Sequence, residues 1–152
     1  VKRAQRTSSS LALMFVDLDK FKPVNDTYGH AAGDFMLQTV AKRLSGCLHA
    51  SDTAARVGGD EFLVLLPDIP SGADALAVAE KIRSALAEPC TSPDGIELCI
   101  SASIGIAIYP EHAGSAHELL RLGDRAMYEA KSAGGNRVKL FSPEDGAGHS
   151  AA

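Results

Sequence analysis

Two segments of this chain place acidic side chains directly beside apolar stretches. Asp17 follows the apolar residues 11–16, and Asp60 and Glu61 follow a pair of glycines. An apolar stretch of that length, bounded by polar residues, is typical of a strand buried on both faces. If the two segments belong to neighbouring strands, the three carboxylates converge at one edge of a sheet. Such a cluster needs protons or a cation to neutralise it, and hard carboxylate oxygens suit magnesium.

The glycine pair Gly58-Gly59 between these strands is compatible with two roles. Glycine adopts backbone conformations closed to other residues, and it removes side chains that would block a phosphate group. A plain tight hairpin also uses Gly-Gly. The pair alone therefore leaves both roles open, and the two acids that follow it give the segment its chemical interest.

The spacing of the apolar residues predicts the elements that must position the carboxylates. Helices are expected at residues 35–48, 74–86 and 115–131, because apolar residues recur three and four apart within them. Ser115 and Glu118 add a capping-box pattern at the start of the last helix. Strands are expected at residues 11–16, 54–57, 62–66 and 138–141, and at two segments between residues 96 and 108.

The order of these elements predicts an α+β fold in the form of an α/β sandwich. Helices would cover a mainly antiparallel central sheet, and a small β-hairpin would surround the glycine pair. The chain has 152 residues, which is enough for one domain with a sizeable core. Its hydrophobic content of 45% and charged content of 22% are those of an ordinary soluble globular protein.

The formal net charge of −4 argues against binding to polymeric nucleic acid, which favours a basic surface. A nucleoside triphosphate remains compatible with this charge, because a metal ion and a few local Lys or Arg side chains can neutralise the phosphates. Cys47, Cys90 and Cys99 are dispersed and without paired spacing. We therefore expect reduced thiols in a cytosol.

The two ends of the chain carry further expectations. No segment approaches the ~20 apolar residues of a membrane span, and no signal peptide is present, so we expect a cytoplasmic domain with no membrane contact of its own. The chain opens without an initiator Met, which suggests a domain of a longer protein that could itself be membrane-anchored. Residues 1–10 are expected to be the frayed end of an upstream segment, and residues 142–152 a disordered tail.

Six short motifs follow one another along residues 11–141. They are Phe15-Val16-Asp17-Leu18-Asp19-Lys20-Phe21-Lys22, Asn25-Asp26-Thr27-Tyr28-Gly29-His30, Gly33-Asp34, the turn at residues 58–62, Ser103-Ile104-Gly105, and Ala126-Met127-Tyr128-Glu129-Ala130-Lys131. Together they resemble the GGDEF domain of bacterial diguanylate cyclases, enzymes that join two GTP into cyclic di-GMP. The resemblance implies the palm-like, ferredoxin-related core that this family shares with nucleotide cyclases and polymerases.

The resemblance implies a metal site at the carboxylates. Asp17, the backbone carbonyl of Leu18 and Asp60 would hold magnesium, or manganese as a second candidate, with Glu61 in or beside the same shell. One of the two turn carboxylates, in the first place Asp60, would help to remove the proton of the attacking hydroxyl. The alternative is that Asp17 or Asp19 caps a helix N-terminus and that Asp60 is an ordinary turn residue.

Asn25 and Asp34 are the residues that the resemblance assigns to base recognition. Guanine presents two N–H donors side by side, and one carboxylate accepts both, whereas adenine has no such pair. An amide such as Asn25 can meet an adjacent donor and acceptor on the base edge. The alternatives are that Asp34 caps a helix beginning at residue 35 and that Asn25 shapes a turn.

Lys22 in the first loop and Lys131 at the end of the last long helix are the phosphate candidates. His30 is compatible with a ribose or phosphate contact, and Gly58 and Gly59 would leave room for the substrate. As isolated residues, the lysines would be solvated surface charges and His30 a loop residue.

The chain departs from the family pattern where phosphate and product would bind. The family usually has Arg where this chain has Gly135, and Arg137 is a partial substitute. A product-inhibition site of the type Arg-x-x-Asp is reduced to His49 and Asp52, and a histidine cannot replicate the planar fork of arginine. That allosteric site is expected to be weak or lost. The family's segment before the first strand, with its Asp-x-Leu-Thr-Gly-Leu pattern, is also not in this chain.

The leading hypothesis is a magnesium-dependent diguanylate cyclase that acts as a homodimer, each domain holding one GTP. The alternative is a regulatory domain that binds GTP or cyclic di-GMP without turnover. Family members of that kind usually have a broken turn motif, whereas this one is intact. A purely structural dimerisation domain is a third hypothesis. An upstream sensor or receiver domain is expected in the full-length protein.

Overall fold

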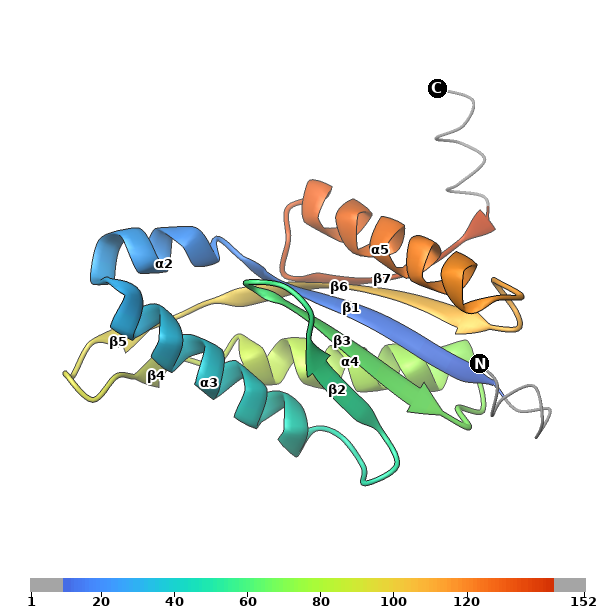
Figure 1. Cartoon of the computed structure of the whole chain (residues 1–152), viewed down its shortest axis with the longest axis horizontal. Helices are drawn as coiled ribbons and strands as arrows, with labels where there is room; N and C mark the ends of the chain where they lie inside the picture. The colour runs from blue at the N-terminus through green and yellow to red at the C-terminus, as the bar shows by residue number, and fades with distance from the viewer. Residues whose placement is uncertain (1–9, 144–152) are drawn as a thin grey trace.

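A five-stranded sheet forms the centre of the molecule in the computed structural model, which describes residues 10–143 (Figure 1). Its strands lie in the order β2 (Thr53–Arg56), β3 (Glu61–Pro67), β1 (Leu11–Asp19), β6 (Ser101–Tyr109) and β7 (Arg137–Leu140). All neighbours are antiparallel except β6 and β7, which are parallel. The prediction of an α+β fold with a mainly antiparallel sheet is therefore confirmed.

Helices cover both faces of this sheet (Figure 1). The helices α3 (His30–Gly46) and α4 (Gly72–Leu86) pack on one face, and α5 (Ala116–Ser132) packs on the other. A short helix, α2 (Phe21–Tyr28), follows β1 directly. A separate two-stranded sheet consists of β4 (Cys90–Thr91) and β5 (Glu97–Leu98). The hairpin around the glycine pair belongs to the main sheet, as its strands β2 and β3.

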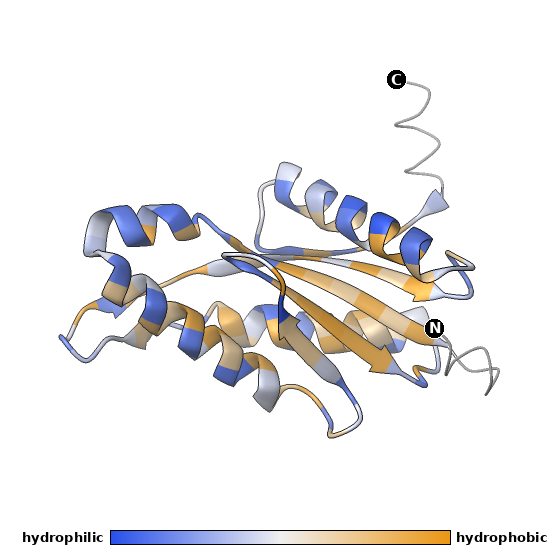
Figure 2. Cartoon of the chain, in the orientation of Figure 1, coloured by the Kyte–Doolittle hydropathy of each residue, from blue (hydrophilic) through white to orange (hydrophobic). Residues whose placement is uncertain are grey.

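The alternation of side chains along β1 decides on which face its two acids lie. Met14 and Val16 pack into the core with α3 and α4, whereas Leu13 and Phe15 pack into the core with α5. The apolar residues of the central strands appear as the orange bands in Figure 2. Successive side chains of a strand point to opposite faces. Asp17 and Asp19 therefore lie on the same face as Leu13 and Phe15, which is the face that α5 covers.

The close approach of α5 to the sheet depends on glycine. A Cβ atom at Gly105 of β6 would collide with the backbone of α5 at Met127 and Gly123. A Cβ atom at Gly123 would lie 2.7 Å from a methyl of Leu13. The Ser103-Ile104-Gly105 motif therefore lets the helix backbone rest on the strand, which brings the C-terminal end of α5 to the edge where β1 ends.

The helix α2 was not predicted, and its presence changes the interpretation of its residues. Phe21 and Val24, three residues apart, are buried, and Pro23 stands within the first turn, where proline is tolerated. Lys22 lies on this helix and not in a loop, and Asn25 is helical and does not shape a turn. The sequence did not reveal this helix, because two apolar residues three apart are too few to show helical periodicity.

The helix α3 begins at His30, five residues before the predicted start at residue 35. Asp34 therefore lies within the helix, and the alternative that it caps the N-terminus is wrong. The N-cap of α2 is Lys20, which makes no side-chain capping bond, so neither Asp17 nor Asp19 is a helix cap. Both acids lie within β1, which continues three residues past the predicted end at residue 16.

The other predicted elements are confirmed with small shifts of their ends. The hydroxyl of Ser115 accepts a hydrogen bond from the backbone N–H of Glu118 at 3.2 Å, as predicted for the start of α5. The helix predicted at 74–86 begins at Gly72, and the segment after residue 96 forms only the short β5 before β6. The predictions for residues 1–9 and 144–152 lie outside the described residues. No helix in the described part combines the length and the apolar character that crossing a membrane requires.

Candidate active site

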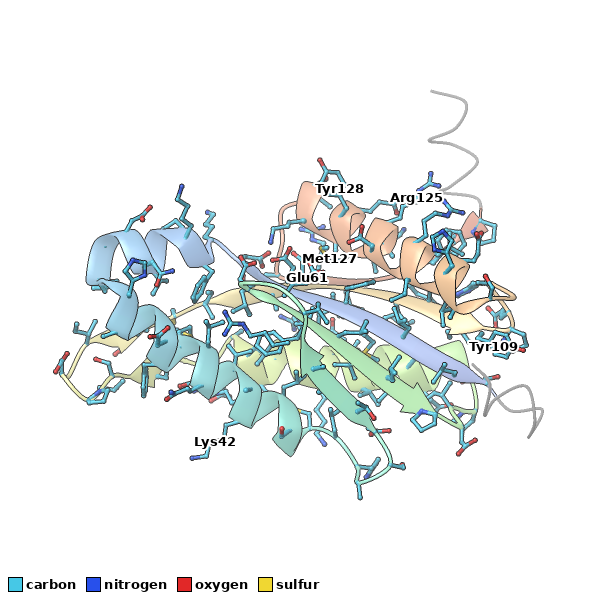
Figure 3. All side chains as sticks on the ribbon, in the orientation of Figure 1. Lys42, Glu61, Tyr109, Arg125, Met127 and Tyr128 are labelled. Carbon is cyan, nitrogen blue, oxygen red and sulfur yellow. The ribbon has the colours of Figure 1, made fainter. Side chains whose placement is uncertain are left out.

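Two carboxylates from neighbouring strands meet at the edge of the sheet beside α5. Asp17 of β1 and Glu61 of β3 are directly opposite each other in the antiparallel register. The backbone N–H of Leu18 donates to the carbonyl of Asp60 at 3.0 Å, which ties the glycine turn to the end of β1. Figure 3 labels Glu61 at the glycine turn, on the side of the sheet toward α5 in this view. The two segments are therefore neighbouring strands, which is the condition under which the sequence predicts that their carboxylates lie close together.

The side chain of Lys131 reaches this edge from the last turn of α5. Its Nζ atom lies 2.8 Å from Asp17 Oδ1 and donates a hydrogen bond of 3.2 Å to the carbonyl of Leu18. It also lies 3.8 Å from Asp19 Oδ1. The contact with Asp17 is an ion pair, and the buried Oδ1 atom has no hydrogen bond of regular geometry. Lys131 thus contacts two of the groups that the resemblance gives to a metal ion.

The carboxylates of this edge are short of positive charge. Burial raises the pKa of the Asp17 carboxyl above its usual value, the Asp60 and Asp19 carboxylates raise it further, and the Lys131 ammonium only partly opposes them. Burial also raises the pKa of Glu61, as do the carboxylates of Asp17, Asp124 and Asp60. A low-dielectric site with several carboxylates favours protons or an added cation.

The residues at this edge fit a divalent cation. They offer a buried oxygen of Asp17, which here contacts the Lys131 ammonium, a backbone carbonyl on the next residue and further carboxylates close enough to shift one another's pKa. Among residues 10–143, however, no three His, Cys, Asp or Glu side chains are arranged so that they could hold a metal ion together. The expected meeting of three carboxylates at one point is therefore not found in this arrangement.

Asp19 has a different environment from Asp17, although both lie on the same face of β1. Its carboxylate accepts hydrogen bonds from Ser101 Oγ and Ser103 Oγ, each at 2.6 Å, and from the backbone N–H of Asn136 at 2.8 Å. Burial alone would raise its pKa, but these bonds and the Lys131 ammonium hold the pKa below its usual value. Asp19 therefore joins β1, β6 and the loop before β7.

The glycine turn does not need glycine for its own fold. Neither Gly58 nor Gly59 has a positive φ, and an added Cβ would meet nothing within 4 Å at Gly59 and only Glu61 Cβ, at 3.5 Å, at Gly58. The explanation of the pair by hairpin geometry is therefore wrong for this structure. Both glycines are exposed, so they leave open space directly before the two acids.

Arg56 stabilises this turn, a role that the sequence did not reveal. Its Nε donates to the carbonyls of Gly58 and Gly59 at 3.0 and 3.1 Å, and its Nη2 donates to the Gly59 carbonyl at 2.8 Å. A guanidinium two residues before a Gly-Gly pair was the available signal, but only the structure shows that the side chain folds back over the turn.

The two residues predicted to read the base lie on neighbouring helices, Asn25 on α2 and Asp34 on α3. The amide of Asn25 on α2 lies against Gly33 of α3, where any Cβ atom would collide with Asn25 Oδ1. Gly33 is therefore required so that the Asn25 side chain can pack against α3 at the residue before Asp34. Asp34 is exposed and lines a hollow of about 380 Å³ between α3 and the β2–β3 hairpin, with Arg56 on the opposite side.

The other predicted substrate residues and the two predicted allosteric residues lie on α2, at the start of α3 and in the loop before β2. Lys22 on α2 and His30, the first residue of α3, are both exposed. His49 and Asp52 lie in the loop between α3 and β2, at the opposite end of β2 from the glycine turn (Figure 1). Asp52 accepts a hydrogen bond from the backbone N–H of His49 at 2.8 Å, so its carboxylate holds that loop.

The structure explains why residue 135 is a glycine here, where the family usually has an arginine. Its φ is +74°, and a Cβ atom would lie 2.9 Å from the carboxyl carbon of Asp19. Any other residue would therefore be strained and crowded in this conformation. Arg137 folds back over the same loop, and its Nε donates to the Gly135 carbonyl at 3.1 Å. Its guanidinium thus lies near the position of the missing arginine, and its role toward phosphate stays a prediction.

Two residues of α5 beside the site were not found by sequence reasoning. Asp124 raises the pKa of Glu61, and Tyr128, one helical turn later, is 68% exposed (Figure 3). Asp124, Tyr128 and Lys131 are spaced four and three apart, which puts them along one side of the helix. That spacing was the available signal, but it did not show that the sheet edge lies below.

The fold and the site define a palm-like α+β domain with an acidic edge next to a hollow suited to a small ligand. The chain belongs to the GGDEF domain family of diguanylate cyclases. The model of that family, described as "Diguanylate cyclase, GGDEF domain", matches residues 1–137.

Curated relatives support this assignment. Diguanylate cyclase TpbB of Pseudomonas aeruginosa (strain UCBPP-PA14) is 48% identical over 135 residues, which is 86% of this chain and 31% of the relative. Diguanylate cyclase A of Treponema denticola is 44% identical over 131 residues, covering 86% of this chain and 35% of the relative. The chain therefore spans about a third of the length of these relatives.

Solved structures share the fold. The crystal structure of the GGDEF domain of YfiN, also called TpbB, from Pseudomonas aeruginosa matches with a TM-score of 0.90 and 45% identity, covering 93% of this chain and 88% of that one. The GGDEF domain of DgcB from Caulobacter crescentus, solved in complex with c-di-GMP, matches with a TM-score of 0.84 and 28% identity, covering 92% and 82%.

Proposed function

We propose that this chain is a catalytic GGDEF domain that condenses two GTP into cyclic di-GMP and releases pyrophosphate. The observation that carries the proposal is the sheet edge itself, where Asp17 and Glu61 meet with too little positive charge around them. Open space at the glycine turn lies directly beside these acids. A triphosphate with its metal ion would supply the missing charge and use that space.

A divalent cation, Mg²⁺ in the first place and Mn²⁺ in the second, supplies neutralisation of phosphate charge when it is bound. Asp17, the Leu18 carbonyl and Asp60 would hold it, with Glu61 beside them. This assignment is supported by the buried Oδ1 of Asp17, which contacts the Lys131 ammonium at 2.8 Å, and by the raised pKa values of Asp17 and Glu61. Oxygen donors of this kind suit hard cations.

The hollow beside Asp34 is the proposed guanine site. The Asp34 carboxylate would accept the two adjacent N–H donors of guanine, and the Asn25 amide would meet the neighbouring groups of the base edge. Lys22 and His30, exposed on α2 and α3, are the proposed phosphate and ribose contacts. The support is that Asp34 lines a hollow of about 380 Å³ and that the Asn25 side chain packs against Gly33, the residue before Asp34.

The reaction needs two such half-sites, so the proposed active form is a homodimer. The 3′-oxygen of one GTP forms a bond to the α-phosphorus of the other, and the bond from that phosphorus to the leaving pyrophosphate breaks. The hydroxyl proton passes to a turn carboxylate, Asp60 or Glu61. The same step in the opposite direction closes the ring, so each cyclic di-GMP is formed with two pyrophosphates.

The experiment is to incubate the purified domain with GTP and Mg²⁺ and to measure cyclic di-GMP by mass spectrometry at several protein concentrations. Specific activity should rise with protein concentration, because two half-sites must meet. A flat dependence would contradict the two-half-site reaction. If GTP binds in a titration but no product forms with Mg²⁺ or Mn²⁺, the domain is a regulatory binding module and the proposal is wrong.

A further inference from the structure

Lys131 occupies the space between the oxygen atoms that the proposed function assigns to a metal ion. Its Nζ lies 2.8 Å from Asp17 Oδ1 and 3.2 Å from the carbonyl of Leu18. The Asp17 oxygen is buried and accepts no hydrogen bond of regular geometry, so this ammonium is the positive charge in direct contact with it. In the free domain, Lys131 therefore neutralises the edge in the way that a bound cation would.

The ammonium and a divalent cation cannot both use these oxygen atoms. Two positive charges that share Asp17 Oδ1 and the Leu18 carbonyl would repel each other strongly at such short range. Lys131 has room to leave, because its side chain is 35% exposed, whereas that of Asp17 is 15% exposed. A lysine ammonium sits on a flexible four-carbon stem, so it can move without displacing α5.

We propose that Lys131 is a built-in competitor for the metal position, which it holds in the free domain and leaves when the metal binds. The identity of the metal ligands in this inference rests on the proposed function. The displaced ammonium then becomes available to a triphosphate, which is the role that the family resemblance gives to Lys131. Metal binding and phosphate binding are thereby coupled through one side chain.

The first test is the Mn²⁺ affinity of the nucleotide-free domain, measured by electron paramagnetic resonance. Lys131→Met, which keeps most of the stem and removes the charge, should bind Mn²⁺ about tenfold more tightly than the unmodified domain, because no charged group must be displaced. Asp17→Asn in the Lys131→Met background should remove this gain. Unchanged or weaker binding by Lys131→Met, or no binding by either protein, would overturn the inference.

A matched control separates the contact from the overall charge. Lys42→Met removes the same charge from an exposed position on α3 (Figure 3) and should leave the Mn²⁺ affinity unchanged. An equal gain in Lys42→Met would show that net charge, and not the Lys131 contact, limits metal binding, and would overturn the inference.

The second test follows the displacement in the unmodified domain, because removal of any nearby positive charge would by itself strengthen cation binding. Trace acetylation by acetic anhydride, quantified by mass spectrometry, should label Lys131 severalfold faster with Mn²⁺ than with EDTA, relative to Lys42 in the same sample. An equal or lower labelling rate with bound Mn²⁺ would overturn the inference. Neither test requires turnover, so a domain that passes both but makes no cyclic di-GMP would refute the proposed function alone.

Discussion

Asp17 and Asp19 stand two residues apart on the same face of β1, yet the protein surrounds them in opposite ways. Asp19 accepts three hydrogen bonds, and its pKa lies below the usual value. Asp17 has a buried oxygen without a regular hydrogen bond, and its pKa lies above the usual value. One strand thus carries an acid that accepts three hydrogen bonds from the fold and an acid whose buried oxygen is paired with the Lys131 ammonium.

The difference comes from the neighbouring strands. Asp19 is opposite Ser101 in the register with β6, and it extends past the last residue of β1 that pairs with β3. Asp17 is opposite Glu61 on the β3 side, so it meets a second acid where Asp19 meets hydroxyls. A buried acid that keeps its donors stabilises the fold, and a buried acid with a raised pKa beside other carboxylates is a candidate for ligand binding.

The largest expected effect is a loss of activity on substitution of Asp17 or of Glu61, the residue opposite it. Asp17→Asn and Glu61→Gln should each lower cyclic di-GMP formation by more than about a hundredfold, because the charge that a metal ion and its phosphates require is lost. Circular dichroism and thermal unfolding should show an intact fold. Activity above a tenth of the unmodified domain in both variants would remove the metal assignment.

The second effect is a loss of stability on substitution of Asp19, which accepts three hydrogen bonds. Asp19→Asn should lower the free energy of unfolding by about 2 to 3 kcal/mol, because the amide presents its own N–H groups to donors that now have no acceptor. The expected fall in Tm is about 10 °C for a domain of this size. Thermal unfolding in EDTA measures it, with Asp17→Asn as the matched control. A lower Tm for Asp17→Asn than for Asp19→Asn would contradict this prediction.

The third prediction extends the comparison to Asp34, an exposed acid on a helix. Asp34→Ser should reduce the preference for GTP over ATP by about tenfold or more, because the acceptor for the paired guanine donors disappears. The Tm should stay within about 2 °C, since Asp34 caps no helix. Competition binding with both nucleotides is the measurement. Unchanged selectivity would move base recognition to another residue.

The smallest effect concerns pH. Because the folded domain raises the pKa of Asp17 and Glu61, their contribution to stability is present below their unfolded values and is lost as the pH rises through the folded values. The lowered pKa of Asp19 acts in the opposite sense, and its contribution is lost only as the pH falls through the folded value.

In EDTA, Glu61→Gln should therefore gain stability relative to the unmodified domain between pH 4.5 and pH 7, by less than about 1 kcal/mol. Mg²⁺ should cancel this gain if it binds at the edge. Urea unfolding at the two pH values measures the difference. A relative loss of stability for Glu61→Gln over that range in EDTA would contradict the raised pKa of Glu61.

Much of the fold followed from local pattern. The apolar periodicity located α4, α5 and the strands of the main sheet, and the motif with Asp17, Asp60 and Glu61 located the acidic edge. The pattern failed at α2, where one buried pair on a short helix was too weak a signal, and at the start of α3. Because of these two errors, the sequence analysis kept two alternatives that the structure contradicts: that Asn25 shapes a turn and that Asp34 caps a helix.

The sequence by itself determined the family, the acidic motif and the two-residue spacing that puts Asp17 and Asp19 on one face of a strand. Only the tertiary structure decided which of the two carboxylates accepts hydrogen bonds from the fold. Their partners come from β3, β6 and the loop before β7, more than forty residues away in the chain. It also decided that Lys131 lies on the proposed metal ligands, since that contact depends on how closely Gly105 lets α5 rest on the sheet. Side-chain types and periodicity are local properties, whereas hydrogen-bond partners and burial are set by packing between distant segments.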